Sequence, residues 1–381
     1  ISSWWAILHG HCEPRLVAAL REQAGRLDHV LFAGATHEPA VQLAERLLQV
    51  VPKGLSRVFY SDDGSTAVEV ALKIVLQGFA QHGEPERRVF VALDGAYHGD
   101  TFGAMAASDP DPFFVPFAPL LFRVRRVPAT SQALEAALDE LGRSCAGVLL
   151  EPLLQGAAGM RLVPAEFVRA VREACTQRGL PLIADEVMTG FGRTGSLFAC
   201  ELAGVAPDLM CVAKGLTGGM LPLAATLATE AWFERFLHGD RSRYFAHGHT
   251  FTANPLACAV AVRSLELCHE DDVPARLQRI GSTLFARLRE LRSHPQVLDL
   301  RHLGGMVAIE LRTPAVDAGY GSSLAPQLRA AALARGVLLR PLGNVLYALP
   351  PACLDDAETN LLADVMHELV VDVAARLPAA R

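Results

Sequence analysis

The chain has 381 residues, of which 51% are hydrophobic and 20% are charged, a composition that favours a large buried core over disorder. Its 35 basic and 41 acidic residues give a net charge of −6, which argues against a nucleic-acid-binding role. Apolar runs stay short of the roughly 18–20 residues that a membrane span needs, no signal peptide is recognisable, and eight cysteines without paired spacing favour reduced thiols and a cytoplasmic protein.

The chain starts with isoleucine rather than methionine, so we expect a further segment to precede it. Two adjacent tryptophans, Trp4 and Trp5, follow. Such a pair can anchor the segment in a core or a dimer contact, or it can form an aromatic wall for a substrate. His9, His11 and Cys12 come next, but their spacing is irregular for a metal site, and we expect no metal there.

Helical and strand patterns alternate through residues 14–270. Apolar residues recur every three or four positions in the ranges 14–28, 39–51, 67–77, 131–142, 165–178 and 256–268. Short apolar runs that predict buried strands occupy the ranges 56–60, 89–93, 147–152, 180–185, 209–213 and 223–227. This alternation predicts an α/β fold with a mostly parallel sheet and helices on both faces. Four prolines predict a rigid surface loop at 109–119.

The pattern changes at about residue 271 to that of a compact α+β domain. Helices are predicted at 274–292, 324–335 and 356–374. Short strands are predicted at 297–300, 306–311, 337–340 and 345–348. We therefore expect a large domain over residues 1–270 and a smaller C-terminal domain over residues 271–381.

A strand, a turn and a helix follow one another around Gly64 and Ser65. The free amides and the positive end of such a helix suit a phosphate group. Ordinary helix capping is the alternative, with Thr66 and Glu69 as a capping box.

Two of the predicted strands run into charged residues, Asp185 and Lys214. Ligands of open α/β sheets collect at the carboxyl ends of the strands, so this acid and this amine should lie side by side. Glycines after Lys214 let the backbone approach a flat ligand, and a partly buried amine is a nucleophile for carbonyl groups. Pyridoxal phosphate (PLP) uses such a lysine for a Schiff base and such an aspartate at its ring nitrogen.

These motifs carry a specific resemblance. Residues 183–186, the Gly-Phe-Gly-Arg-Thr-Gly run at 190–195 and residues 213–215 resemble the signature of class III (ω-type) PLP-dependent aminotransferases. The resemblance implies fold type I of the PLP-dependent transferases, PLP as cofactor, and Lys214 and Asp185 as catalytic residues. Residues 190–195 also match the dinucleotide fingerprint, but that motif should follow a strand directly and open a helix. A nicotinamide dehydrogenase is therefore the weaker alternative.

The resemblance also implies roles for residues around the cofactor. Gly64 and Ser65 would bind its phosphate, and Tyr97 would stack on its ring. A loop around residues 246–255 would cross a homodimer, placing the active site at the subunit interface and bringing Thr250 to the partner's phosphate. His249 stands where related enzymes often have proline, and its contact with the cofactor is correspondingly open.

Three nearby side chains keep alternative interpretations. Glu151 ends a predicted strand and either contacts the cofactor or holds Arg193. His98 follows Tyr97, and we expect it either to support the residues that contact the cofactor or to fix the loop.

Further runs, including residues 2–5, 97–105 and 214–219, resemble the branch of the family that serves biotin synthesis. This branch implies S-adenosylmethionine as the amino donor and a long apolar keto acid with a terminal carboxylate as the acceptor. A family member that acts on ornithine, 4-aminobutyrate or a similar ω-amine is the alternative. The small-molecule substrates would contact a set of residues that comprises Trp4, Tyr97, Lys214, Gly248 and Arg340, with the arginine as a fork for the carboxylate.

Overall fold

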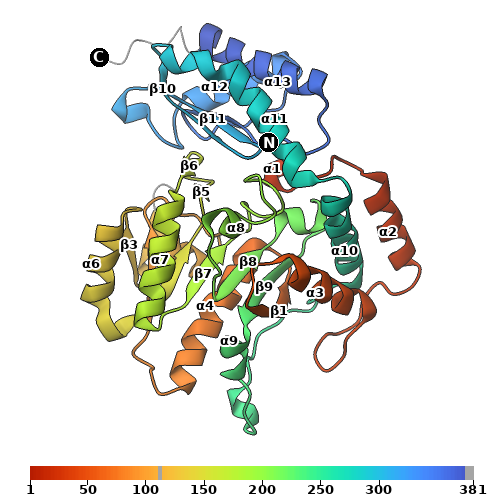
Figure 1. Cartoon of the computed structure of the whole chain (residues 1–381), viewed down its shortest axis with the longest axis vertical. Coiled ribbons are helices and arrows are strands. Elements are labelled where there is room, and N and C mark those ends of the chain that lie inside the picture. Colours follow the sequence, from red (N-terminus) through yellow and green to blue (C-terminus); the bar gives the residue numbers. More distant parts are fainter. Residues whose placement is uncertain (110–113, 374–381) are drawn as a thin grey trace.

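The computed structural model describes residues 1–109 and 114–373, which form two lobes (Figure 1). A seven-stranded sheet lies in the larger lobe and a three-stranded sheet in the smaller one. Each lobe has a hydrophobic core of its own. Near residue 270, where the sequence predicts a domain boundary, α10 (Pro255–Glu270) ends and α11 (Val273–Leu288) begins.

The sheet of the larger lobe has the strand order β1-β9-β8-β7-β4-β2-β3. The bounds are β1 Leu55–Ser61, β2 Val89–Leu93, β3 Val124–Val127, β4 Cys145–Leu150, β7 Leu182–Asp185, β8 Leu209–Val212 and β9 Ala224–Thr229. β9 runs antiparallel to β1 and β8, and the other neighbouring pairs are parallel. The mostly parallel sheet predicted from the sequence is therefore confirmed.

Helices cover both faces of this sheet, which is why its central strands read as continuous apolar runs. One face packs against α4 (Gly64–Gln81), α5 (Phe102–Ala107) and α9 (Glu230–Glu234). The other face packs against α3 (Glu38–Val50), α6 (Ser131–Leu141), α7 (Ala165–Arg178), α8 (Ala199–Ala203) and α10. Along β7, for example, Ile183 faces the first layer and Ala184 the second, as the twofold period of a strand requires.

Three local predictions for this lobe need correction. The helix expected over 14–28 is α2 (Pro14–Ala24), and the chain leaves it four residues early. The capping box of α4 is formed by Asp63 and Thr66 rather than by Thr66 and Glu69. In the proline-rich stretch 109–119, residues 110–113 lie outside the described part, and Val115–Leu120 forms a 3-10 helix, η1, instead of an irregular loop.

The smaller lobe places three helices on an antiparallel sheet of β10 (Val297–Leu303), β11 (Met306–Leu311) and β12 (Val345–Ala348). Its helices are α11, α12 (Leu324–Ala334) and α13 (Asp356–Glu368).

The helices and the other three strands predicted for this lobe are correct in type, but one predicted strand is wrong and some bounds differ. The predicted strand 337–340 is wrong, because this segment pairs with no strand of the described chain and leaves Leu338 57% exposed. The helix predicted over 274–292 changes to a 3-10 helix, η5, at Arg289–Ser293. α13 continues as a π-helical turn, η7, over Leu369–Val373, and the predicted end of that helix at residue 374 lies outside the described residues.

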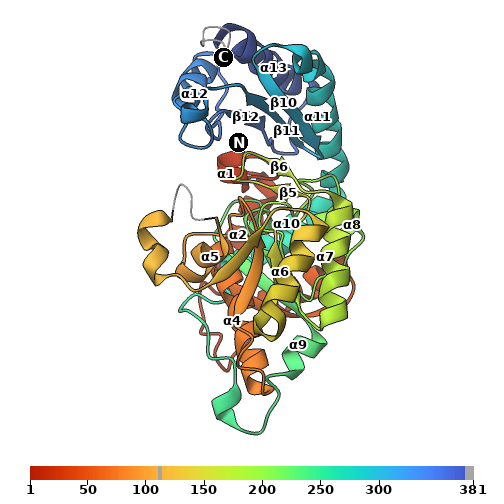
Figure 2. The same cartoon turned by 90° about the vertical axis from the view of Figure 1, so that its left-hand side faces the viewer.

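The N-terminal segment lies between the two lobes (Figure 2). Here α1 (Ser2–Trp5) adjoins a hairpin of β5 (Leu154–Gln155) and β6 (Arg161–Leu162). Trp5 packs with Leu154 of the larger lobe and with Tyr347 of the smaller one, and Ser2 Oγ donates to Leu349 O over 2.7 Å. The first residues therefore connect both lobes above the large sheet.

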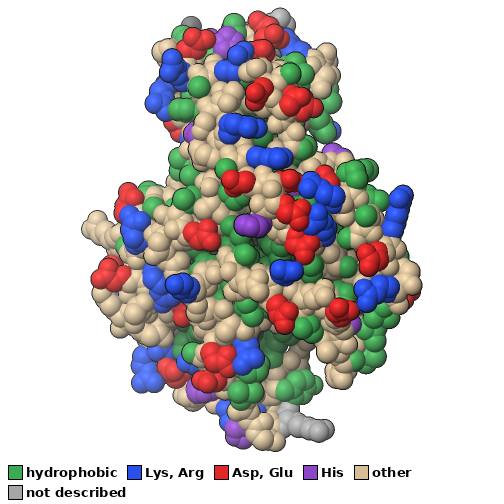
Figure 3. Space-filling model, turned by 45° about the vertical axis from the view of Figure 1, so that its right-hand side comes forward, with side chains coloured by type: hydrophobic (Ala, Val, Ile, Leu, Met, Phe, Trp, Pro, Cys, Tyr) green, Lys and Arg blue, Asp and Glu red, His purple; other side chains and the backbone are tan. Residues whose placement is uncertain are grey.

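The surface carries charges of both signs. Figure 3 shows Lys and Arg side chains interspersed with Asp and Glu over this face of the molecule rather than gathered by sign. In the stretches 1–109 and 114–373, none of the helices is both long and apolar enough to cross a membrane.

Candidate active site

A cavity of about 670 Å³ opens at the carboxyl ends of β7 and β8. Asp185 and Lys214, which sequence analysis places at one sheet edge, both line it. They come together because β7 and β8 are parallel neighbours, so the two strands end at the same edge. Further lining residues come from the N-terminal segment, the start of α4, the loop after β2, the end of β4 and the turn after Lys214.

Lys214 directly follows β8 and Ala213, and its backbone has a φ of +47°. Its Nζ lies 4.7 Å from the centre of the Trp5 ring. Burial lowers the pKa of the Lys214 amine to about 8, with a smaller contribution from Arg193, against the raising effect of the Asp185 and Glu151 carboxylates. A substantial fraction of this amine is therefore neutral and nucleophilic near pH 8.

Asp185 is the last residue of β7 and is buried. Its Oδ2 lies 2.7 Å from Nδ1 of His98, and its Oδ1 accepts a hydrogen bond of 3.0 Å from the amide of Val187. The Nε2 atom of His98 is buried and has no partner among the described residues. His98, for which sequence analysis leaves open a role behind the site residues or in fixing the loop, thus contacts Asp185 directly.

Glu151 and Arg193 lie close to the site but do not bind each other. Glu151 accepts hydrogen bonds from the amides of Tyr97 (3.2 Å) and Gly156 (2.9 Å). Burial raises the pKa of Glu151 to about 7, with His98 opposing and Asp185 supporting that rise. The interpretation in which Glu151 holds Arg193 is therefore wrong, and its carboxyl group lines the cavity instead.

Arg193 is a buried cation that binds backbone carbonyl groups. Its Nη1 donates to Pro350 O over 2.7 Å, and its Nη2 donates to Trp5 O over 2.9 Å and to Ile7 O over 2.8 Å. Burial lowers its pKa to about 10. The Gly-Phe-Gly-Arg-Thr-Gly run thus fixes the N-terminal segment and the smaller lobe to each other and does not open a helix as a dinucleotide motif would.

Gly64 and Ser65 lie at the amino end of α4, on another wall of the same cavity. Their amides precede the first internal hydrogen bond of that helix, from Ala67 N to Asp63 O. The space is tight, since a Cβ at Gly64 would lie 2.6 Å from a methyl carbon of Val187. A helix amino end with a serine hydroxyl in a narrow cradle is suited to an anion.

Tyr97 also lines the cavity, and its hydroxyl donates to Asp100 Oδ1 over 2.9 Å. Five predicted site residues do not line it, namely Trp4, Gly248, His249, Thr250 and Arg340. Of these, Gly248 and Thr250 are exposed on the surface of the chain. His249 has its Nε2 3.8 Å from Oδ1 of Asp62, a residue that does line the cavity.

The two tryptophans do not lie as predicted, because Trp4 was the expected substrate contact. Trp5 lines the cavity and donates from Nε1 to the Tyr347 hydroxyl over 2.8 Å. Trp4 is 51% exposed and lies under the Arg340 guanidinium, whose central carbon is 3.9 Å from the ring centre. Arg340 also donates to the Tyr320 hydroxyl over 3.3 Å. The sequence signal for Trp5 was the tryptophan pair itself, but nothing in the pattern distinguished its two members.

The chemistry of these residues fits PLP. The neutral amine of Lys214 suits an aldehyde, the buried carboxylate of Asp185 suits a ring cation, and the start of α4 suits a phosphate. All three line a single cavity. Within the described residues, no group of three His, Cys, Asp or Glu side chains is arranged to hold a metal ion.

Comparison with known proteins identifies a family. Residues 1–370 match the family model described as aminotransferase class III. The chain is 46% identical to an adenosylmethionine-8-amino-7-oxononanoate aminotransferase of Synechococcus elongatus, over 97% of this chain and 90% of that protein. It is 41% identical to the protein of the same name from Mycobacterium leprae, over 97% and 85% of the two chains.

Solved structures agree with this assignment. A crystal structure of the adenosylmethionine-8-amino-7-oxononanoate aminotransferase from Methanocaldococcus jannaschii superposes with a TM-score of 0.93 at 35% identity, covering 97% of this chain and 88% of that one. An amine transaminase from an uncultivated Pseudomonas species, solved in its PLP-bound form, gives a TM-score of 0.90 at 30% identity, with coverage of 96% and 88%. The fold is therefore that of PLP-dependent transferases of type I.

Proposed function

The chain belongs to the class III aminotransferase family, and from this premise we propose that it transfers an amino group from S-adenosylmethionine to 8-amino-7-oxononanoate. The product is 7,8-diaminononanoate, and the reaction serves biotin synthesis. The single observation that carries the substrate pair is the 46% identity to a relative of that name over 97% of this chain. The TM-score of 0.93 with a second relative of that name supports it.

Lys214 and Asp185 are the catalytic residues of this proposal. When bound, PLP supplies a reactive aldehyde and an electron-accepting ring. Lys214 would attach the cofactor and, once released, would move a proton at its amine as base and then acid. Asp185 keeps the ring nitrogen in its cationic form, and its hydrogen bonds with His98 and Val187 fix its orientation. The burial that lowers the pKa of Lys214 to about 8 suits both of its tasks.

Gly64, Ser65 and Tyr97 complete the cofactor site from the same chain. The amides at the start of α4 receive the phosphate, and the Ser65 side chain is held beside them by its hydrogen bonds with Thr101. Tyr97 places its ring against the cofactor, and its backbone is held by the buried carboxyl group of Glu151.

Arg340 is the residue of choice for the acceptor carboxylate, because its guanidinium binds a carboxylate through two parallel hydrogen bonds. Trp4 stacks on this guanidinium and orients it, so its role differs from the aromatic wall first expected. That wall is provided by Trp5, which faces the Lys214 amine.

The active enzyme is a cytoplasmic homodimer in this proposal, with the site at the subunit interface. Thr250 reaches the phosphate of the partner subunit, with Gly248 and His249 shaping its loop. This assignment is supported by the exposure of Thr250 and Gly248 on the isolated chain and by the neighbouring exposed aromatic side chains, Tyr244 at 62% and Phe251 at 58%.

Two measurements test the proposal. The purified protein with PLP should convert 8-amino-7-oxononanoate to the diamine with S-adenosylmethionine, and it should do so faster than with ornithine or 4-aminobutyrate as donor. Efficient turnover of those ω-amines with 2-oxoglutarate, and none with S-adenosylmethionine, would instead identify another member of the same family. A protein that binds PLP but performs neither half-reaction would contradict both alternatives.

A further inference from the structure

The turn that follows Lys214 has a backbone that needs support from its surroundings. Lys214 itself has a φ of +47°, in the left-handed region that residues with a Cβ avoid. The turn is closed by a hydrogen bond of 2.9 Å from Gly218 N to Gly215 O. An unfavourable backbone conformation of this kind persists only where neighbouring groups hold it. The contacts on the far side of this turn therefore help to set the direction of the Lys214 amine.

Two buried polar side chains contact this turn from the side away from the cavity. Ser264 on α10 is 1% exposed, and its Oγ lies 3.3 Å from the carbonyl oxygen of Gly215. His9 of the N-terminal segment is 6% exposed, and its Nε2 lies 3.1 Å from the same Oγ. The His9 ring also packs on Gly218, where an added Cβ would come within 3.0 Å of it. A chain of hydrogen bonds thus ends on the residue next to Lys214.

The chemistry of the three groups fixes the direction of these hydrogen bonds. A carbonyl oxygen only accepts, so the Ser264 hydroxyl donates its single proton to Gly215. His9 must then donate to Ser264 from Nε2. Burial lowers the pKa of His9 to about 4, against the raising effect of Asp271 and Glu13. At neutral pH the ring is therefore uncharged, with its proton on Nε2.

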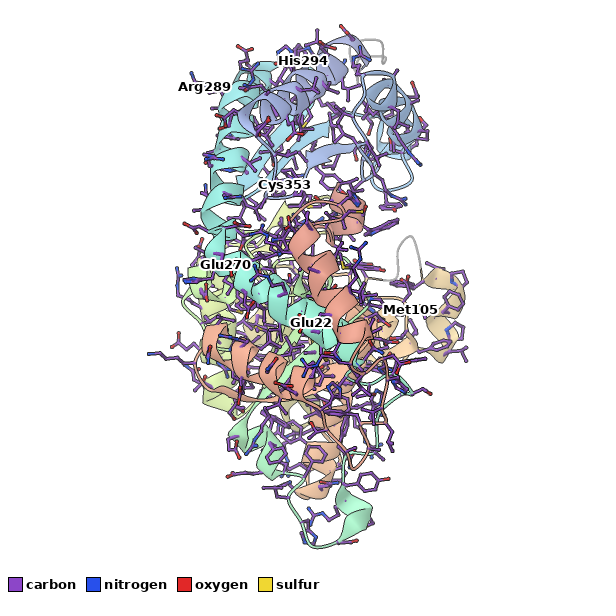
Figure 4. The ribbon with its side chains drawn as sticks, turned by 90° about the vertical axis from the view of Figure 1, so that its right-hand side faces the viewer. Glu22, Met105, Glu270, Arg289, His294 and Cys353 are labelled. Carbon is purple, nitrogen blue, oxygen red and sulfur yellow. The ribbon has the colours of Figure 1, made fainter. Side chains whose placement is uncertain are left out.

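Rigid elements hold both side chains. The amide of Ala352 donates to Leu8 O over 2.8 Å, directly before His9. The helix that follows His9, α2, lies along α10, as Figure 4 shows, where Glu270 marks the end of α10 nearer the smaller lobe. Because α10 also carries Ser264, the backbone on both sides of this contact is held by packed elements.

We propose that His9 and Ser264 are positioning residues for the reaction, which hold the backbone turn at Lys214 through a relay from His9 by way of Ser264 to Gly215. The relay keeps the amine in the orientation in which it attaches the cofactor and moves protons. This inference rests on the proposed function of Lys214. Neither His9 nor Ser264 lines the cavity, so their effect is indirect.

The test compares variants that break the relay with one that restores it. Ser264→Ala and His9→Leu remove a donor, whereas His9→Gln keeps an amide N–H that can reach Ser264. The first readout is the rate at which the cofactor-free protein captures PLP, followed by its visible absorption across pH. The second is the split between kcat and KM in the transamination assay.

We expect wild-type capture to rise with a midpoint near pH 8, where the Lys214 amine loses its proton. In Ser264→Ala and His9→Leu, a looser turn exposes the amine to water, so the midpoint should move upward by about half a pH unit or more. In these two variants kcat should fall about fivefold, the equivalent of one hydrogen bond, with KM unchanged. His9→Gln should lie close to wild type, and the double variant should be no worse than the single ones.

Thr359→Val is the matched control, because Thr359 is also buried and donates a 2.7 Å hydrogen bond to a backbone carbonyl, but on α13 of the other lobe. It should lose stability without a shift of the capture midpoint. Wild-type midpoints in Ser264→Ala and His9→Leu, or a His9→Gln as impaired as His9→Leu, would overturn the relay. Failure of the wild type to capture PLP at all would instead contradict the proposed function of Lys214.

Discussion

The Nδ1 atom of His98 lies 2.7 Å from Oδ2 of Asp185, and both residues are buried and line the cavity. The aspartate carboxylate is thus fixed from behind by an imidazole and from the side by the amide of Val187. Its remaining lone pairs are free to accept a ring N–H⁺ from within the cavity.

Replacing Asp185 by asparagine keeps the shape of the side chain and removes its negative charge. The amide fills the same space but cannot hold a ring nitrogen in its cationic form, so we expect kcat to fall by about 10²–10⁴-fold while PLP still binds. His98→Leu should give a smaller loss of about tenfold, since the carboxylate remains but is less well oriented. Steady-state kinetics and cofactor absorption check both variants. Equal losses of kcat in the two variants would contradict a direct role of Asp185 and an indirect role of His98.

Lys214→Ala should abolish covalent capture of PLP and lower transamination by at least about a thousandfold, because the variant loses both nucleophile and base. Mass spectrometry after borohydride reduction should find the cofactor on Lys214 in the wild type and on no residue of the variant. Lys53→Ala, at an exposed position before β1, is the control and should behave as wild type.

The lowered pKa of Lys214 also predicts how stability depends on pH. The folded protein holds this amine with a pKa of about 8, below its value in the unfolded chain, so the unfolded state binds more protons between those two values. The contribution of Lys214 to stability therefore rises with pH in that window and is least favourable below pH 8. Lys214→Met should stabilise the cofactor-free protein at pH 7 more than at pH 10, as urea unfolding at the two pH values would reveal.

Arg193→Ala should destabilise the protein strongly. It leaves the carbonyl groups of Trp5, Ile7 and Pro350 without their shared donor in a buried place, which costs on the order of 2–4 kcal/mol. Arg193→Lys should recover only part of this loss, because an ammonium cannot match the planar fork. Denaturant unfolding measures the loss of stability. An Arg193→Ala protein as stable as wild type would show that the hydrogen bonds of Arg193 to the three carbonyl groups do not stabilise the fold.

Mixed dimers test the proposed contribution of Thr250 from the partner subunit. Lys214→Ala and Thr250→Ala should each be impaired alone. Mixing the two should restore activity toward a quarter of the wild-type level, because half of the dimers are hybrids and each hybrid has one site with both residues intact. No recovery in dimers verified to be mixed would place Thr250 outside the partner's site.

Much of the fold could be read from the chain. The strands that end at Asp185 and before Lys214 were found because apolar runs of a parallel sheet are distinctive, and their neighbouring positions followed from the rule on strand ends. Segment 337–340 has the same local pattern but pairs with no strand in the described chain. Pairing depends on what lies beside a segment, which the local sequence does not contain.

Site residues could be predicted only where they lie in a regular helix or strand or directly follow one. Trp4 and Trp5 have positive φ values of 65° and 72°, so neither helical nor strand periodicity tells which ring faces the lysine. The carbonyl partners of Arg193 come from residues 5, 7 and 350. Every residue has a backbone oxygen, so the sequence does not indicate which ones will bind a side chain. His9 was weighed only as a metal ligand, since its partner Ser264 is 255 positions away.

The hydrogen bonds of Arg193 to three backbone carbonyl groups have a consequence for folding during synthesis. Two of its three partners, Trp5 and Ile7, precede Lys214 in the chain, whereas the third, Pro350, follows it. A nascent chain halted before Pro350 would contain Lys214 and Asp185 but would lack the third carbonyl partner of Arg193. The wall of the cavity that Trp5 forms is thus fixed by chain from both sides of Lys214, and we expect the site for the vitamin B6 cofactor to be complete only after Pro350 has been added.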